Sequence, residues 1–430
     1  MLVSPPGGCK GGGRRTTLDD GHRDLSSASM TEHFTPTRTA ALEKLAAFLP
    51  KAARDYAAQR NYDRGSGRHD GVSMLSPYIR HRVLTEEEVL DAVLGRYALN
   101  SAEKFVQEVF WRTYWKGWLE MRPTIWVGYQ QGVLRALDQI QTQSGLRAEW
   151  EAACTGQTDI ACFNYWAKEL VETGYMHNHA RMWFASIWIF TLRLPWELGA
   201  DFFLRHLLDG DPASNTLSWR WVAGLQTQGK NYAARAANIS KYTEGRFSPI
   251  HQLTPNPEPL GGPAHPPRIG APQGDRLDAS KRTVFLLHED DLSPGWLFEQ
   301  GLKPVATATL DTAYKLSPLH VAHRVTSFKS ALMNDTTNRW SNRLGTLAHG
   351  LATAAEIADW ATHNQAEQIV TSYAPVGAVA DLLRDEGAPK VIQPLRDFDQ
   401  RAWPHATAGF FKFKKNIPEL VGAQKNMTLV

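Results

Sequence analysis

The stretch that decides the fold is "WAKELVETGYMHNHARMWFASIWIFTL", residues 166–192. Apolar side chains recur at helical spacing on both sides of Thr173 and Gly174, and glycine commonly ends a helix. We therefore predict two helices joined at this point. The apolar run 182–196 is shorter than a membrane span and contains Arg193, so we predict a helix buried on all sides rather than a membrane helix.

The helical period extends over most of the first half of the chain. Residues 37–60 and 101–121 repeat apolar side chains at helical spacing. Thr85 and Glu88 have the spacing of a capping box at the start of another helix. No stretch between residues 39 and 247 has a convincing strand pattern, so this half is predicted to be all-α.

The second half has a different pattern. Eight prolines lie between Pro249 and Pro272, a density typical of a linker. Beyond it, short β-type runs alternate with helical patterns, which predicts a parallel α/β sheet with Rossmann-like winding. No glycine-rich dinucleotide motif or Walker A motif is present. The β-type runs are 282–290, 303–310, 367–373 and 389–394, and the helical ones are 327–347 and 375–387.

The predicted fold class is therefore multidomain α and α/β, an all-α domain followed by a Rossmann-like α/β domain. Residues 1–35 are rich in Gly, Ser and Arg, a composition that predicts disorder. We expect the all-α domain over 36–248, the linker over 249–280 and the α/β domain over 281–430.

Composition excludes few classes of function. The net charge of +3 is too small to indicate nucleic-acid binding by itself. Cys9, Cys154 and Cys162 have no metal-site or disulfide pattern, which favours a reducing, cytoplasmic compartment. No apolar run of signal-peptide length occurs near the start. Most of the fifteen tryptophans are expected in the core, where they also offer stacking surfaces.

The stretch "DGDPASNTLSWRW", from Asp209 to Trp221, combines two aspartates, an asparagine and two tryptophans. A calcium loop normally has more oxygen ligands and a bidentate glutamate downstream, and this stretch has neither. We therefore predict no metal here, which leaves a flat redox cofactor as the other interpretation.

Several motifs together resemble the flavin-binding domain of the photolyase/cryptochrome family. They occur in the family's order and at nearly its spacing over residues 50–245. The resemblance implies FAD, folded into a U shape within a helical bundle. The motifs are "YAAQRNY" (56–62), "SMLSPYI" (73–79), "QEVFWRTYW" (107–115), "TGYMHNHARM" (173–182), "LLDGDPASN" (207–215) and "WRW" (219–221).

The resemblance also implies which residues hold the cofactor. Hydroxyls and free N–H groups at a helix start suit a pyrophosphate, although a serine there is often only a cap. Val72 stands where the family usually has a hydroxyl. Arg181 and Asp209 would pair against the flavin ring. The implied set is Tyr56, Ser73, Leu75, Ser76, Arg112, Asn178, Arg181, Asp209, Gly210, Asp211 and Asn215.

Asn215 corresponds to the residue beside the flavin N5. A neutral amide cannot readily protonate the flavin there, whereas plant cryptochromes have an aspartate. Asn215 therefore favours full reduction of the flavin and a repair enzyme.

The implied substrate residues are Arg60, Glu108, Trp111, Met182 and Trp221. Glu108 and Trp111 lie three residues apart on one helix face, and with Trp221 they would clasp a flipped-out pyrimidine dimer. Tryptophan and methionine at helical spacing are otherwise typical of a core.

Two further inferences concern the same substrate. The histidines that (6-4) photolyases need are absent at Asn178 and Met182, which argues against (6-4) repair. The basic residues Arg60, Arg112 and Lys116 would track DNA phosphates, with Arg112 placed alternatively against the cofactor.

Trp219 and Trp196 match the inner members of the family's electron relay, and Trp126, Trp150 or Tyr129 would substitute for the outer one. The α/β region is either an antenna domain in permuted order or an unrelated module. Its residues identify no antenna chromophore.

The resemblance implies a deoxyribodipyrimidine photo-lyase acting on UV-damaged DNA, with Glu108, Asn215, Trp219 and Trp196 as catalytic residues. We expect a monomer without membrane attachment. The alternatives are a cryptochrome-type photoreceptor without repair turnover and a flavin-free nucleic-acid-binding protein.

Overall fold

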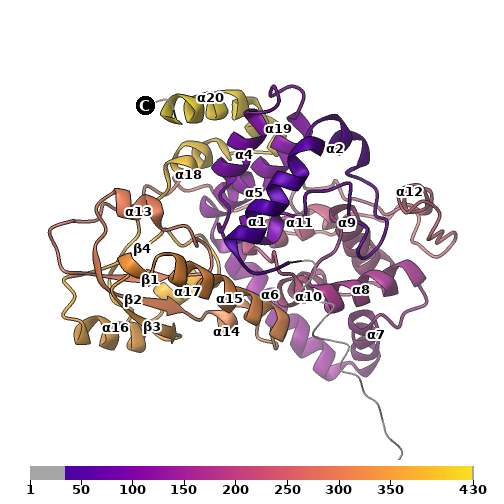
Figure 1. Cartoon of the computed structure of the whole chain (residues 1–430). Coiled ribbons are helices and arrows are strands. Elements are labelled where there is room, and N and C mark those ends of the chain that lie inside the picture. The colour runs from indigo at the N-terminus through magenta and orange to yellow at the C-terminus, as the bar shows by residue number, and fades with distance from the viewer. Residues whose placement is uncertain (1–33, 429–430) are drawn as a thin grey trace, which may run out of the picture.

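The structure, a computed structural model, describes residues 34–428, so the disorder predicted for residues 1–35 falls almost entirely outside it. A helical body and a body built on a parallel sheet lie side by side (Figure 1). The fold class predicted from the sequence, all-α followed by α/β, is confirmed.

Local sequence signals set the ends of several helices. Thr85 and Glu88 form the predicted capping box. The predicted helix pair is present, with Gly174 in the left-handed conformation (φ 71°) after the first of them. The helical body consists of α1 (Arg38–Phe48), η1 (Leu49–Lys51), α2 (Arg54–Gln59), α3 (Ser76–Arg80), α4 (Glu86–Leu94), α5 (Glu103–Glu120), α6 (Thr124–Thr142), α7 (Ser144–Thr155), α8 (Ala161–Thr173), α9 (Asn178–Ser186), η2 (Ile187–Thr191), α10 (Trp196–His206), α11 (Pro212–Ala223) and α12 (Ala236–Tyr242).

The apolar run 182–196 is not one helix. Helix α9 passes into the π-helical turn η2, which ends at Thr191, and α10 begins only at Trp196. Pro195 lacks an amide hydrogen and disfavours the helical conformation in the residue before it. The prediction of burial is correct, since every residue of the run from Trp183 to Phe190 is buried. No helix within residues 34–428 is long and apolar enough to cross a membrane.

The second body contains five parallel strands in the order β3-β2-β1-β4-β5. Four of them lie in the predicted β-type runs. The strands are β1 (Thr283–Leu287), β2 (Pro304–Leu310), β3 (Thr346–Leu351), β4 (Gln368–Thr371) and β5 (Val391–Ile392), and the helices are α13 (Gly295–Glu299), α14 (Ala313–Leu316), α15 (His323–Arg339), η3 (Ser341–Arg343), α16 (Ala354–His363), α17 (Ala378–Leu383), α18 (Asp397–Ala402), η4 (Trp403–His405), α19 (Phe410–Phe413), η5 (Lys414–Asn416) and α20 (Ile417–Thr428).

The sequence prediction missed β3 and extended the preceding helix over its start. The helix α15 ends at Arg339, and β3 begins at Thr346. This strand pairs only with β2 at the edge of the sheet, and its residues are exposed or half-buried. An edge strand with so little buried surface needs no apolar run and therefore leaves little signal in the sequence.

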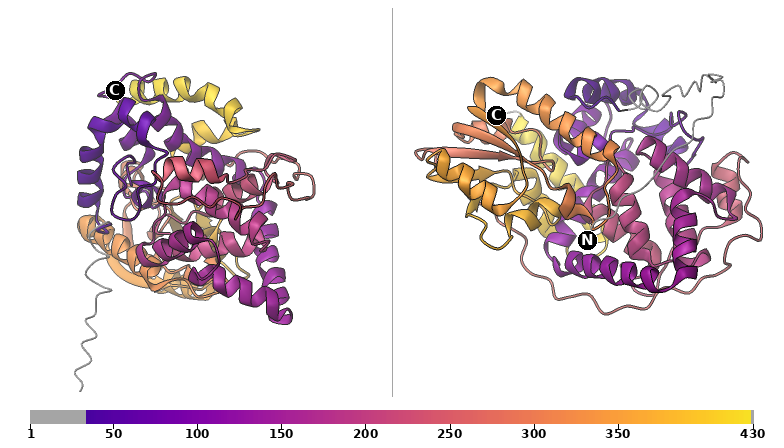
Figure 2. Two further views of the ribbon diagram at one scale, coloured as in Figure 1. Left: turned by 90° about the vertical axis from the view of Figure 1, so that its right-hand side faces the viewer. Right: turned by 90° about the horizontal axis from the view of Figure 1, so that it is seen from below.

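Both faces of the sheet are covered. Alternate residues of a strand point to opposite faces, and Phe285 and Leu287 join the core of the helical body, whereas Val284 and Leu286 join a smaller core on the other face. Figure 2 shows α15 along one side of the sheet and α16 along the other. This two-sided burial explains why β1 is apolar along its whole length.

The segment 249–280 is extended and contacts both bodies (Figure 2). The amide of Leu260 donates to Ala223 at 2.9 Å, and that of Ile269 donates to Met121 at 3.0 Å. The amide of Asp275 then donates to Gln393, directly after β5, at 3.0 Å. The proline-rich segment is therefore bound to the protein surface along much of its course.

After β5 the chain returns to the helical body. Phe398 packs on Phe110 with ring centroids 5.7 Å apart, and the Tyr114 hydroxyl donates to the carbonyl of Ala408 at 2.7 Å. Helices α18 and α19 both pack on α5. The two bodies thus share one continuous core.

The side chain of Glu120, at the end of α5, forms hydrogen bonds with the α/β body. Its carboxylate accepts the amide of Val376 at 2.6 Å and the hydroxyl of Tyr373 at 2.7 Å. Burial raises the pKa of Glu120 to about 7, despite these two hydrogen bonds. A raised carboxyl pKa means that the folded state holds the proton more tightly than the unfolded state. The free energy of unfolding therefore falls as the pH rises from the ordinary pKa of a glutamate to about 7, the pKa of Glu120 in the folded protein.

Glu120→Gln should remove this loss of stability, because the neutral amide resembles the protonated carboxyl. The Tyr373 hydroxyl can rotate so that its oxygen accepts a hydrogen bond from the amide group. Between about pH 5 and about pH 8 the variant should gain up to about 3 kcal/mol relative to the wild type in urea unfolding. Glu103→Gln on the same helix is the control, because Lys414 lowers the pKa of Glu103 and keeps its titration below this range. A pH-independent difference between Glu120→Gln and the wild type would contradict the account.

Candidate functional site

The predicted cofactor residues gather around the start of α11. Asp211 caps this helix by accepting the amide of Ser214 at 2.7 Å, and Pro212 occupies the first turn, both favourable choices at a helix N-terminus. Asp209 accepts a hydrogen bond from Arg181 of α9 at 3.0 Å. Both carboxylates are buried. Burial acts to raise the pKa of Asp209, but Arg181 outweighs it and the pKa lies below the usual range.

Asn215 lies one turn further along α11. Its Nδ2 donates to the carbonyl of Ala200 at 2.8 Å, and the side chain is buried. This bond fixes the orientation of the amide, so the amide oxygen is the atom that can meet a ligand.

The predicted phosphate loop leads into α3. The amide of Leu75 donates to Ser73 Oγ at 3.4 Å, and Ser76, which begins the helix, is close enough to Asp209 to help lower the pKa of its carboxyl. The loop and the aspartates are thereby brought together. Tyr56 lies apart from this contact, packed on Phe105. Asn178, the first residue of α9, is exposed.

Several buried polar atoms beside Asp211 lack a hydrogen-bond partner among residues 34–428. Arg112 Nη1 and Lys116 Nζ lie 3.8 and 4.0 Å from Asp211 Oδ2, too far for a hydrogen bond. Asp209 Oδ1 and Ser214 Oγ are also without a partner. Buried polar atoms are normally hydrogen-bonded, so this cluster indicates a polar ligand with both acceptors and donors.

The prediction that Lys116 contacts DNA phosphates is wrong. Its side chain is 2% exposed, so it cannot track DNA phosphates. Burial lowers the pKa of Lys116, although Asp211 and Glu86 act in the opposite sense. The residue instead belongs to the buried cluster around Asp211.

Arg80 joins this cluster to the α/β body. Its side chain is 1% exposed, donates to Gly210 O at 2.9 Å, forms a short contact with Asp290, and lies 3.7 Å from Asp211. Asp290 follows β1, so Arg80 links the carboxyl end of the sheet to the predicted cofactor residues Gly210 and Asp211. The same buried layer continues through the ion pairs Lys329–Glu289, Arg82–Asp399, Arg82–Glu86 and Arg396–Asp291.

The predicted substrate residues lie mainly on α5. Glu108 pairs with Arg60, which directly follows α2. Burial raises the pKa of Glu108, and Arg60 only partly opposes this effect. Glu108 therefore holds its proton more readily than an exposed glutamate, as a donor to a carbonyl requires.

Trp111 and Trp221 come from α5 and α11, which pack against each other. Both indoles are half-buried. The Trp111 ring stacks on Phe410 with centroids 3.7 Å apart and planes at 12°. Trp221 stacks on Tyr232 at 5.6 Å. Met182, one turn into α9, is also half-buried.

Aromatic side chains surround the start of α10. The Trp219 ring lies against Gly199, where a Cβ atom would collide with it. Trp196 contacts Tyr129 with centroids 5.8 Å apart, and Tyr129 contacts Trp126 at 5.2 Å. Of the three candidates for an outer relay residue, Tyr129 is the one in ring contact with Trp196.

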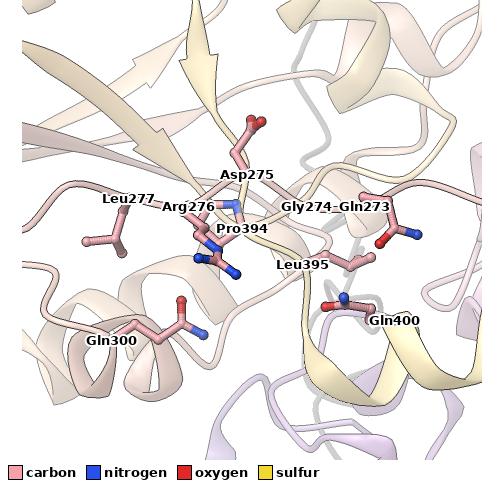
Figure 3. A pocket seen from close by; sticks show the side chains of 9 residues that line it. All are labelled: Gln273, Gly274, Asp275, Arg276, Leu277, Gln300, Pro394, Leu395 and Gln400. Atoms are coloured by element: carbon pink, nitrogen blue, oxygen red, sulfur yellow. The ribbon is translucent and has the colours of Figure 1, made fainter.

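Surface pockets of the described residues also lie outside this cluster. One is lined by Trp196 and Glu197 together with linker residues. Another lies between the linker and the segment that follows β5, where Arg276 and the glutamines Gln300 and Gln400 surround a polar opening (Figure 3). None of our predicted cofactor or substrate residues lines this second pocket.

The family follows from a comparison of this helical body with known sequences. Residues 105–250 match the family described as the FAD binding domain of DNA photolyase. The helical body therefore contains a FAD-binding domain of the photolyase type. FAD is accordingly its cofactor, and the unpartnered atoms beside Asp211 fit a ligand that carries both phosphates and a hydrogen-bonding ring.

Curated relatives agree over the same part of the chain. The deoxyribodipyrimidine photo-lyase of Synechococcus sp. is 31% identical over 195 residues, which are 44% of this chain and 39% of the relative. That of Escherichia coli is 30% identical over 213 residues, 47% of this chain and 42% of the relative. The chain thus spans about two fifths of the length of these photolyase-family relatives.

A solved structure, a bacterial class III photolyase from Agrobacterium tumefaciens, is 24% identical with a TM-score of 0.42. The match covers 52% of this chain and 46% of that one. Likeness at this level is too slight to position a residue.

Proposed function

We propose that this photolyase-family protein is a light-driven lyase that splits cyclobutane pyrimidine dimers in DNA. When bound and reduced, FAD would supply in light the electron needed to break the two carbon–carbon bonds that join the pyrimidines, and it would regain that electron, so the reaction would be redox-neutral overall. The protein supplies placement and electrostatics.

One observation carries this proposal. Helix α5 presents Arg112 to the buried carboxylate of Asp211, and the adjacent turn of the same helix presents Glu108 and Trp111. Cofactor and substrate residues therefore share one rigid element, which holds donor and acceptor at a fixed separation.

On the cofactor side, the loop from Ser73 to Ser76 would bind the pyrophosphate, and the cations Arg112 and Lys116 would stabilise negative charge on the reduced ring. The neutral amide of Asn215 would accept a hydrogen bond beside the ring without supplying a proton to it. The Arg181–Asp209 pair would pack against the ring.

On the substrate side, Trp111 and Trp221 would stack on the flipped pyrimidines, and this stacking would offset the cost of unstacking the bases, about a few kcal/mol. A protonated Glu108 would donate to a pyrimidine carbonyl, with Arg60 holding it in place. Met182 would line the same site.

Electrons that reduce the flavin would pass along Trp219 and Trp196, and we place Tyr129 as the next member because it is in ring contact with Trp196. The proposal also includes UV-damaged DNA as the partner and the cytoplasm as the location.

A cryptochrome-type photoreceptor is the second candidate. The observation that favours it is the stack between Phe410 and Trp111, because a segment from the α/β body covers one face of the proposed substrate tryptophan.

The deciding experiment is a repair assay with reduced, flavin-loaded protein on UV-irradiated oligothymidine, in blue light and in darkness. Loss of dimers should occur only in light and should fall at least about tenfold in Trp111→Ala. Trp360→Ala, which removes a half-buried indole of α16, should retain repair. A flavin-loaded, photoreducible wild type that leaves dimers intact would exclude the repair proposal and leave the photoreceptor.

A further inference from the structure

A short C-terminal segment that packs on α5 lies against the proposed substrate site, and its sequence combines anchoring and exposed residues. This segment, "FFKFKK" (410–415), forms α19 and the start of η5. Phe410 is buried and stacks on Trp111 at 3.7 Å, and Phe413 is buried near Phe110 with ring centroids 6.1 Å apart. Both anchors therefore fix the segment to α5.

The intervening residues face outwards. Phe411 is 79% exposed, more than any other large hydrophobic residue described. Lys412 and Lys415 are exposed as well, and no carboxylate within the described residues forms an ion pair with either of them. Lys414, in contrast, is paired with Glu103 at 2.8 Å.

The segment thus presents one exposed aromatic side chain, Phe411, followed in the chain by two lysines that form no ion pair within the described residues. Its chemistry matches a duplex from which a base pair has been extruded: apolar wedges insert at disrupted base steps, and lysines neutralise the flanking phosphates. Its position matches too, because Phe410, next to Phe411 in the chain, touches the tryptophan on which a flipped dimer would stack.

We propose that the 410–415 segment is a DNA-contact element: Phe411 fills the gap left in the duplex beside a flipped dimer, and Lys412 and Lys415 bind the adjacent phosphates. This inference rests on the proposed repair function, and it gives the C-terminal segment a direct part in lesion binding.

The test measures binding of the full-length, flavin-loaded protein, in darkness, to a duplex with one thymine dimer and to the same duplex undamaged. Phe411→Ser should weaken binding to the dimer duplex about tenfold and affect the undamaged duplex much less. Lys412→Gln with Lys415→Gln should weaken both and reduce the slope of log affinity against log salt by about 2.

Matched controls come from exposed residues of α14 and of the sheet loops. Tyr314→Ser removes an aromatic that is 52% exposed, and Lys303→Gln with Lys390→Gln removes two exposed lysines. These variants should bind as the wild type does.

The outcomes separate the two proposals. If the wild type repairs dimers but the segment variants bind like the controls, the DNA-contact element is wrong and the repair function stands. If the wild type shows no preference for dimer DNA, both fail. Binding of the wild type to anionic lipid vesicles that the segment variants lose, with DNA binding unchanged, would overturn the inference in favour of a membrane surface.

Discussion

Asp290→Ala is expected to destabilise the protein by about 3 kcal/mol, because it leaves Arg80 buried without its closest counter-charge. Arg80 keeps only the more distant carboxylates of Asp211 and Glu289, at 3.7 and 3.8 Å. Urea unfolding followed by tryptophan fluorescence measures the change. Flavin retention should fall as well, since Arg80 also holds the carbonyl of Gly210.

Asp385→Ala is the matched control. It breaks the Lys315–Asp385 pair, whose side chains are 24% and 35% exposed, and exposed pairs contribute at most about 1 kcal/mol. If both substitutions reduce the free energy of unfolding equally, burial does not make the Arg80–Asp290 pair more stabilising than an exposed pair. Other contacts would then hold the two bodies together.

Asp209→Asn is expected to raise the dissociation constant of FAD about a hundredfold. The substitution keeps the shape of the side chain but removes the charge that pairs with Arg181 at 3.0 Å. Loss of one partner of a buried, hydrogen-bonded charge pair costs about 2–5 kcal/mol in binding. Flavin absorbance of the purified protein, and titration of the flavin-free protein with FAD, give the measurement.

Asp335→Asn provides the comparison, because Asp335 pairs with Arg339 of α15 at 2.8 Å, away from the proposed site. It should leave FAD affinity unchanged. If Asp209→Asn also binds FAD like the wild type, the Arg181–Asp209 pair serves the fold of α9 and α11 rather than the cofactor.

The sequence was informative wherever one short segment determines its own structure. The capping box at Thr85 and the stop at Gly174 are local signals, and the structure confirms both. The separate motifs around Asp209 and Ser76 could be brought together only through the family resemblance, since their spacing along the chain does not show that Ser76 lies close to Asp209.

The features that were missed depend on long-range contacts. Arg80 and Asp290 are 210 positions apart, and nothing local shows that they meet. A partial signal existed, because "HEDD" (288–291) follows a predicted strand, and ligands and partners often meet parallel strands at their carboxyl ends. Lys116 was misplaced on the surface because a lysine is rarely buried. Likewise, the stacking of Phe410 on Trp111 depends on how the chain after β5 returns to α5.

The most direct test of the central claim is the fluorescence lifetime of reduced flavin bound to the protein, with saturating single-stranded DNA that contains a thymine dimer or lacks one. Electron transfer to a dimer held against Trp111 should shorten the lifetime with damaged DNA and leave it unchanged with undamaged DNA. Equal lifetimes while damaged DNA is demonstrably bound would contradict the account, because no electron would then reach the dimer.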